Sequence, residues 1–211
     1  MTGIGTGVNG GFAEYCTVNA KQAYKLPDDL SFEAAMPQGD TVMIIGVGTI
    51  GMIMLQLAKT AGAATLILME PIGQKREMVK KLGADITINP MNEDLDKMLE
   101  ENGNKQIDKV IECVGLVDTM KTAIRYTGKG GTTMLFGLTD PDSEIPIKPF
   151  EIFKNEIIVK ASFVNPYTQM RAVKLLASKA IDVASLITDI VSLENINNVF
   201  MTDKYKNSGK Y

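Results

Sequence analysis

Three closely spaced glycines are the residues whose spacing points most directly to a ligand. Gly46, Gly48 and Gly51 form G-x-G-x-x-G between an apolar run and a segment of helical periodicity. In such a turn the first glycine permits a tight bend and the second lets the backbone approach a pyrophosphate. The third lets the helix pack close to the strand, so that its N-terminal N–H groups face the anion. The alternative, a tight turn without a ligand, is less favoured because Glu70 ends the next apolar run, where a dinucleotide site has an acid.

Apolar runs that alternate with amphipathic segments place this turn at the edge of a predicted parallel sheet. Near-continuous apolar strands separated by helices predict an α/β fold, a doubly wound parallel sheet of the Rossmann type, with ligands outside the carboxyl ends of the strands. The predicted strands are 41–45, 65–69, 86–89, 110–114, 132–136 and 157–163, with a further strand at 12–18 outside the alternation. The predicted helices are 49–61, 73–82, 92–101, 117–126 and 168–178, and a proline-rich stretch follows residue 136.

Composition excludes several classes of function. Of the residues 45% are hydrophobic and 22% charged, and the net charge is −3, without a long basic run, so a nucleic-acid or membrane surface is not predicted. Two cysteines and no recognisable export signal favour a reducing cytoplasmic location. The chain has no histidine, the commonest general base and metal ligand.

Several phrases in order along the chain resemble the zinc-dependent medium-chain alcohol dehydrogenases, nearest to the polyol and threonine dehydrogenase branch. The phrases are Gly11-Phe-Ala-Glu-Tyr15, Lys25-Leu-Pro-Asp-Asp-Leu-Ser-Phe-Glu33, Gly39-Asp-Thr-Val42, Gly46-Val-Gly-Thr-Ile-Gly51, Lys81-Leu-Gly-Ala-Asp85, Val110-Ile-Glu-Cys-Val-Gly115 and 130–137. The resemblance implies hydride transfer between an alcohol and NAD, with a zinc ion that binds the alkoxide.

The sequence departs from this family in ways that predict a truncated and internally deleted member. The family carries a zinc-binding cysteine and a His-Glu pair before the Gly11 phrase, and a helix-length segment that is missing where Met36 runs directly into Pro37. The resemblance then implies three parts. Residues 1–36 would be a remnant of a β-rich, GroES-like catalytic domain, 37–180 the NAD-binding domain, and 181–211 a return toward the catalytic domain.

The resemblance assigns cofactor contacts but no catalytic residue and no metal ligand. Ile50 falls where the backbone meets the pyrophosphate, and Glu70 matches the acid that accepts hydrogen bonds from the adenosine ribose. A carboxylate there would repel a 2′-phosphate, so NAD is favoured over NADP, although the neighbouring Arg76 leaves room for NADP. The remaining implied contacts are Lys75 near the ribose and Gly115 and Gly137 beside the nicotinamide half. A solvated charge explains Lys75 nearly as well, and turn-forming glycines explain Gly115 and Gly137 equally well.

The two cysteines, Cys16 and Cys113, are interpreted as small buried thiols. The family is expected to bind zinc, but we expect this chain to lack the zinc ligands. Residues 142–147 resemble the edge segment through which such dehydrogenases join sheets into a homo-oligomer, while a proline-rich loop is the competing interpretation. We therefore expect an NAD-linked oxidoreductase acting on a small alcohol or polyol. The alternatives are an NAD-binding module and an inactive product.

Overall fold

The computed structural model describes residues 39–103, 106–162 and 168–201, apart from the side chains of the last two. The chain divides into two compact units, one of residues 33–163 and one formed by the two ends of the chain. The first unit holds the sheet, and the predicted strand at 12–18 lies outside the described residues. The domain boundaries given above, after 36 and after 180, stay predictions.

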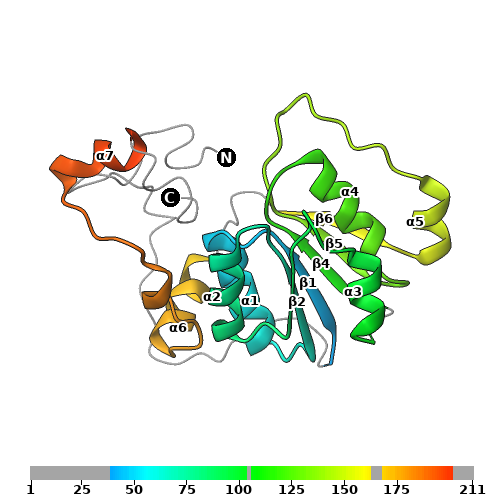
Figure 1. The fold of residues 1–211 in the computed structure, drawn as a ribbon, viewed down its shortest axis with the longest axis horizontal. Coiled ribbons are helices and arrows are strands. Elements are labelled where there is room, and N and C mark those ends of the chain that lie inside the picture. The colour runs from blue at the N-terminus through cyan, green and yellow to red at the C-terminus, as the bar shows by residue number, and fades with distance from the viewer. Residues whose placement is uncertain (1–38, 104–105, 163–167, 202–211) are drawn as a thin grey trace. The chain divides into compact units, whose positions relative to one another are not determined.

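A six-stranded parallel sheet forms the centre of the first unit, in the strand order β3-β2-β1-β4-β5-β6 (Figure 1). Its strands are β1 (Thr41–Ile45), β2 (Thr65–Met69), β3 (Ile86–Ile88), β4 (Lys109–Glu112), β5 (Thr132–Leu135) and β6 (Ile158–Ala161). The register sets Met43 of β1 opposite Ile67 of β2 and Val110 of β4. The predicted doubly wound α/β fold is therefore confirmed.

Helices cover both faces of the sheet because alternate residues of each buried strand point to opposite sides. The helices of this unit are α1 (Thr49–Thr60), α2 (Gly73–Leu82), α3 (Leu95–Glu101), α4 (Val117–Tyr126) and α5 (Pro149–Asn155). Met43 and Ile45 lie in one core cluster with Leu99 of α3 and Ala123 of α4. Ile44 points the other way, toward α1.

Most predicted ends of strands and helices shift by at most two residues, and two differences are larger. The helix predicted to begin at residue 92 begins at Leu95, because the side chain of Asp94 caps it by accepting a 3.2 Å hydrogen bond from the N–H of Lys97. The proline-rich stretch after β5 also contains a helix that sequence analysis missed. Pro149 starts α5, since a missing N–H costs nothing in the first helical turn. Residues 142–147 form no strand.

The second unit contributes short helical elements among its described residues. They are α6 (Gln169–Ala177), the 3₁₀ turns η2 (Ala184–Leu186) and η3 (Leu193–Asn195), and α7 (Ile196–Met201). The helix predicted at 168–178 is thus found as α6.

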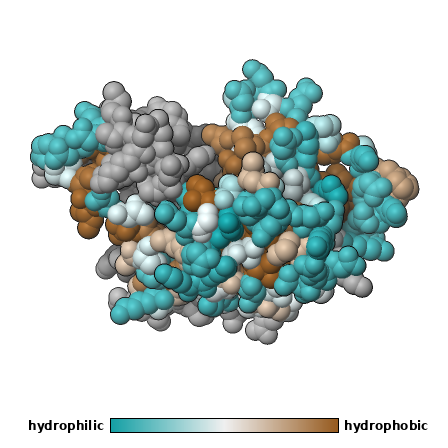
Figure 2. All heavy atoms as spheres, in the orientation of Figure 1, coloured by the Kyte–Doolittle hydropathy of each residue, from teal (hydrophilic) through white to brown (hydrophobic). Residues whose placement is uncertain are grey.

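The outer faces of the helices are polar, as solvated helices of a layered fold require. Figure 2 shows hydrophilic side chains over α2 and α3, where the ion pairs Lys80–Glu77 and Lys97–Glu101 lie in solvent. Within the described part of the chain, no helix has the length and apolar character needed to cross a bilayer.

Candidate functional site: a dinucleotide cradle at the carboxyl edge

The glycine turn after β1 shows three different local environments for its three glycines. Gly46 has a φ of +91°, which an L side chain rarely adopts, and its N–H donates to the carbonyl oxygen of Met69 at 2.9 Å. A Cβ on Gly51 would collide with the carbonyl oxygen of Gly46, so the helix reaches this close to the strand only with glycine there. Gly48, by contrast, has nothing within 4 Å of the place where its Cβ would be. The turn therefore leaves one open position in an otherwise packed bend.

That open position lies at the N-terminus of α1, a helix of 12 residues. Gly48 is the N-cap residue, no side chain caps the helix, and its first turn contains no acidic residue. Because the first turn of a helix leaves N–H groups without intrahelical acceptors and carries partial positive charge, this end of α1 suits an anion. Ile50 is 43% exposed beside it.

Glu70, directly after β2, lies against this turn with its side chain only 5% exposed. Its Oε2 accepts a 2.9 Å hydrogen bond from the N–H of Val47, and its Oε1 accepts a 3.0 Å hydrogen bond from the N–H of Ile72. The carboxylate therefore ties the glycine turn to the end of β2. Each carboxylate oxygen has further lone pairs, so acceptor capacity toward a ligand remains.

Two cations lie in the first turn of α2, beside the end of β2. Lys75 and Arg76 are both partly exposed. Arg76 donates from Nη1 to the carbonyl oxygens of Glu70 and Pro71, both at 2.7 Å. The sequence predicted a cation here but not these two hydrogen bonds to the main chain, which fix the turn that carries Glu70.

The predicted residues at the ends of β4 and β5 are also brought together. Gly115 has a φ of +85°, and a Cβ on it would collide with the main chain of Leu138. A Cβ on Gly137 would in turn collide with the N–H nitrogen of Gly115. Both glycines are therefore required for the close approach of two turns, independently of any ligand.

These turns share one edge of the sheet. They follow the carboxyl ends of β1, β2, β4 and β5, and the strand order reverses between β1 and β4, whose connections run to opposite faces. In open α/β sheets the crevice at such a switch point is the ligand site. The structure thus places the predicted cofactor-binding residues around the switch point, and which of them touch a ligand stays a prediction.

The described residues offer no metal centre to this edge. They contain no group of three or more His, Cys, Asp or Glu side chains placed to hold a metal ion. Cys113 follows β4, and burial, with the nearby Glu112 charge, raises the pKa of its thiol from 9.0 to about 12. Cys16 lies outside the described residues.

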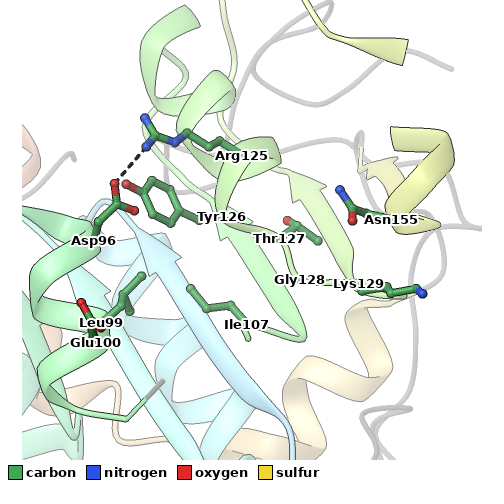
Figure 3. Close-up of a pocket in the computed structure, with 10 residues that line it drawn as sticks. All are labelled: Asp96, Leu99, Glu100, Ile107, Arg125, Tyr126, Thr127, Gly128, Lys129 and Asn155. Atoms are coloured by element: carbon green, nitrogen blue, oxygen red, sulfur yellow. Dashed lines mark hydrogen bonds and ion pairs between the residues drawn. The ribbon is translucent and has the colours of Figure 1, made fainter. Parts of the chain in front are cut away.

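A hollow of about 450 Å³ lies at the opposite, amino-terminal edge of the sheet, between α3 and the end of α4 (Figure 3). Among its lining residues, Arg125 pairs with Asp96 at 2.9 Å, and its guanidinium lies 5.1 Å from the centre of the Tyr126 ring. Burial and the neighbouring Asp96 raise the pKa of Tyr126 to about 12, so its phenol stays neutral. The hollow lies at the edge of the sheet away from the glycine turn and Glu70, so it is not the candidate site.

Comparison with known proteins identifies the family of the chain. Residues 49–178 match the family model described as zinc-binding dehydrogenase. The alcohol dehydrogenase of Geobacillus stearothermophilus is 30% identical over 214 residues, which cover 93% of this chain and 62% of that protein. The sorbitol dehydrogenase of Bos taurus is 28% identical over 216 residues, covering 93% of this chain and 60% of that protein.

Among solved structures, a protein of Sinorhizobium meliloti 1021 described as a zinc-binding dehydrogenase, bound to NADP, superimposes with a TM-score of 0.83 at 32% identity. The match covers 94% of this chain and 64% of that protein. The chain spans about three fifths of the length of the curated relatives it matches. Because the family model covers more than half of the sequence, the chain belongs to the zinc-binding dehydrogenase family.

Proposed function

We propose that this chain binds NAD(H) at the carboxyl edge of its sheet, as the dinucleotide-binding part of an alcohol or polyol dehydrogenase. The observation that carries the proposal is the open position at Gly48, in a turn whose other glycines are tightly packed. The pyrophosphate would lie there, against the N-terminus of α1 and beside Ile50. A nicotinamide cofactor bound in this way accepts a hydride from an alcohol carbon.

The preference for NAD over NADP rests on Glu70. Its carboxylate lies where the adenosine ribose is expected, and a 2′-phosphate there would meet a buried negative charge. Arg76, which could otherwise neutralise a phosphate, is held by the carbonyl oxygens of Glu70 and Pro71. The NADP bound to the relative from Sinorhizobium meliloti argues for measuring both cofactors.

The test is a pair of fluorescence titrations of the purified chain, with NADH and with NADPH. We expect saturable binding with a preference for NADH, and we expect Glu70→Gln to reduce that preference because it removes the charge while keeping an acceptor. Lys80→Gln, which changes an exposed charge of α2, is the matched control. Tighter binding of NADPH by the unaltered chain would overturn the proposed preference, and the absence of binding to either would overturn the function.

A second candidate function is dinucleotide binding without hydride transfer by this chain alone. It is favoured by the available metal ligands: the chain has no histidine, and the described residues contain no group of three or more His, Cys, Asp or Glu side chains placed to hold a metal ion. Zinc analysis after purification from zinc-supplemented medium separates the two candidates. One tightly held zinc ion per chain, together with NAD-dependent oxidation of a polyol, would exclude this second candidate.

We further propose self-association through the edge of the sheet that ends in β6. All four residues of β6 are exposed, including Ile158 at 48% and Val159 at 41%. An exposed apolar edge strand is a template for pairing with another chain. Light scattering that shows a monomer at high concentration would remove this proposal.

A further inference from the structure

Glu112, the last residue of β4, is a buried charged group to which sequence reasoning assigned no role. Its side chain is 0% exposed. Burying a carboxylate is costly unless hydrogen bonds replace its water, so the contacts of this side chain show what it does.

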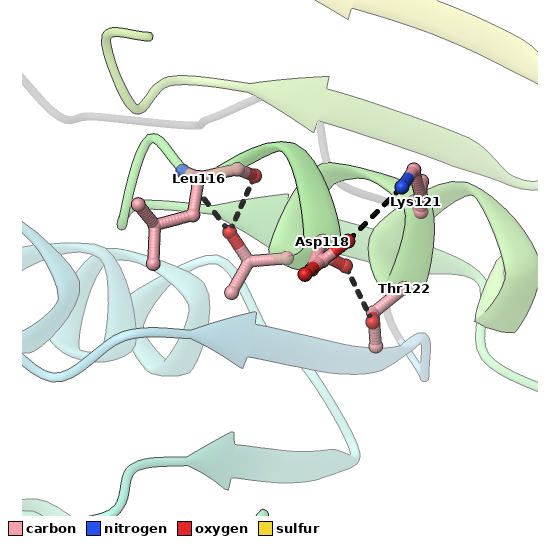
Figure 4. Close-up of polar contacts among 5 residues, drawn as sticks. Leu116, Asp118, Lys121 and Thr122 are labelled. Carbon is pink, nitrogen blue, oxygen red and sulfur yellow. Dashed lines mark hydrogen bonds and ion pairs between the residues drawn. The ribbon is translucent and has the colours of Figure 1, made fainter. Parts of the chain in front are cut away.

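One oxygen of Glu112 holds the turn that follows β4. Its Oε1 accepts hydrogen bonds from the N–H of Val114 at 2.8 Å, the N–H of Gly115 at 2.9 Å and the hydroxyl of Thr119 at 2.8 Å. The same hydroxyl lies 2.8 Å from the carbonyl oxygen of Leu116, in the first turn of α4 that Figure 4 shows. Glu112 therefore fixes both the turn after β4 and the start of α4.

The rest of Glu112 faces the turn that follows β5. Its carbonyl oxygen accepts from the N–H groups of Phe136 and Gly137, both at 2.9 Å. Its Oε2 is buried without a hydrogen-bond partner among the described residues, and a Cβ on Gly137 would come within 2.5 Å of it. One residue thus joins the two turns that carry Gly115 and Gly137.

We propose that Glu112 is a positioning residue that sets the affinity for the nicotinamide half of the dinucleotide. The inference rests on the proposed function, and on the expectation from the family resemblance that the nicotinamide half lies beside Gly115 and Gly137. Hydrogen bonds to a carboxylate are roughly twice as strong as those to a neutral amide, so removing the charge loosens the turn after β4. None of these hydrogen bonds reaches the glycine turn or Glu70. The Val114 side chain lies against Gly46 but is itself unchanged, so we expect the adenosine half to keep its site.

The experiment compares NADH with ADP-ribose, which lacks the nicotinamide, by calorimetric titration of the full chain. Glu112→Gln is expected to weaken NADH binding about tenfold and to leave ADP-ribose affinity within about twofold. Asp118→Asn, the same chemical change on the exposed side of the first turn of α4, is expected to leave both affinities unchanged. Equal loss for both ligands, or no loss for either, would overturn the inference.

A milder variant keeps the test decisive if Glu112→Gln does not fold. Thr119→Val removes one of the three donors at nearly constant volume and is expected to weaken NADH binding about threefold without affecting ADP-ribose. An unselective effect would contradict the positioning role. If the unaltered chain binds neither NADH nor ADP-ribose, the proposed function fails and the inference fails with it. If it binds both and the variants act alike on both, only the inference fails.

Discussion

Replacing the second and third glycines of the turn with alanine is expected to separate binding from stability. At Gly48 the backbone has φ −80° and ψ −174°, which alanine adopts freely, and nothing lies within 4 Å of the added Cβ. Gly48→Ala should therefore change the free energy of unfolding by no more than about 0.5 kcal/mol. The new methyl group would occupy the space proposed for the pyrophosphate, so NADH affinity should fall at least about tenfold, or 1.4 kcal/mol.

At Gly51 the expected result is a loss of stability. The added Cβ would meet the carbonyl oxygen of Gly46, a backbone atom that cannot move aside cheaply. Overpacking against such a backbone atom falls at the upper end of the usual range, about 3 kcal/mol, and the better helix propensity of alanine returns about 1 kcal/mol. We expect Gly51→Ala to lower the free energy of unfolding by about 2 kcal/mol.

Urea unfolding followed by circular dichroism, with NADH titration of each folded variant, measures both effects. Gly103→Ala, at an exposed turn with φ +72° and nothing within 4 Å of the added Cβ, is a control that strains the backbone away from the site and should lower stability without lowering NADH affinity. The reasoning is refuted if Gly48→Ala binds NADH as tightly as the unaltered chain, or if Gly48→Ala and Gly51→Ala destabilise the fold equally.

Three further outcomes are expected from other parts of the sheet and its helices. Burial raises the pKa of the Cys113 thiol in the folded chain to about 12, against an ordinary 9.0. The contribution of this buried neutral thiol to the free energy of unfolding should therefore be complete below about pH 9 and decline as the pH rises toward 12. Maleimide labelling of Cys113, followed by peptide mass spectrometry, should be slow at pH 8 and fast only in urea, and rapid labelling of the native chain would contradict this. Asp94→Ala removes the cap of α3 and should cost about 1 kcal/mol in urea unfolding, whereas Asp94→Ser should recover most of it. The hydroxyls of Thr127 and Thr133 are hydrogen-bonded at 2.6 Å in the core, so Thr127→Val should lower the free energy of unfolding by about 1–3 kcal/mol. Changing both residues to valine should cost less than the sum of the two single changes, and strict additivity would show that the pair does not interact.

The sheet could be predicted from the sequence because its strands are unbroken apolar runs. Residues 42–45 are at most 1% exposed, as a strand covered on both faces requires, and the glycine spacing marked the turn that follows. Helix boundaries were less accurate where a cap decides them, as Asp94 does for α3. The helix α5 was missed because its signal, a proline in the first turn, stands among other prolines that indicate a loop.

The sequence predicted that the glycines and Glu70 lie at the carboxyl edge of the sheet, but it predicted less about the hydrogen bonds that hold them. Spacing identifies where a carboxylate lies along the chain, but it does not reveal that Glu70 accepts from Val47, or that Arg76 bonds to two carbonyl oxygens. The role of Glu112 depends on turns from two strands that meet only in the folded sheet. Its one sequence signal was a charged residue inside an apolar strand.

Hydrogen exchange measured by mass spectrometry, with and without NADH, tests the central claim most directly because it locates the bound cofactor. We predict slower exchange in peptides that cover residues 46–52 and 113–116, at the carboxyl edge of the sheet, and no change in peptides that cover 125–129 at the opposite edge. Protection confined to 125–129, or no protection anywhere at a saturating NADH concentration, would contradict the account.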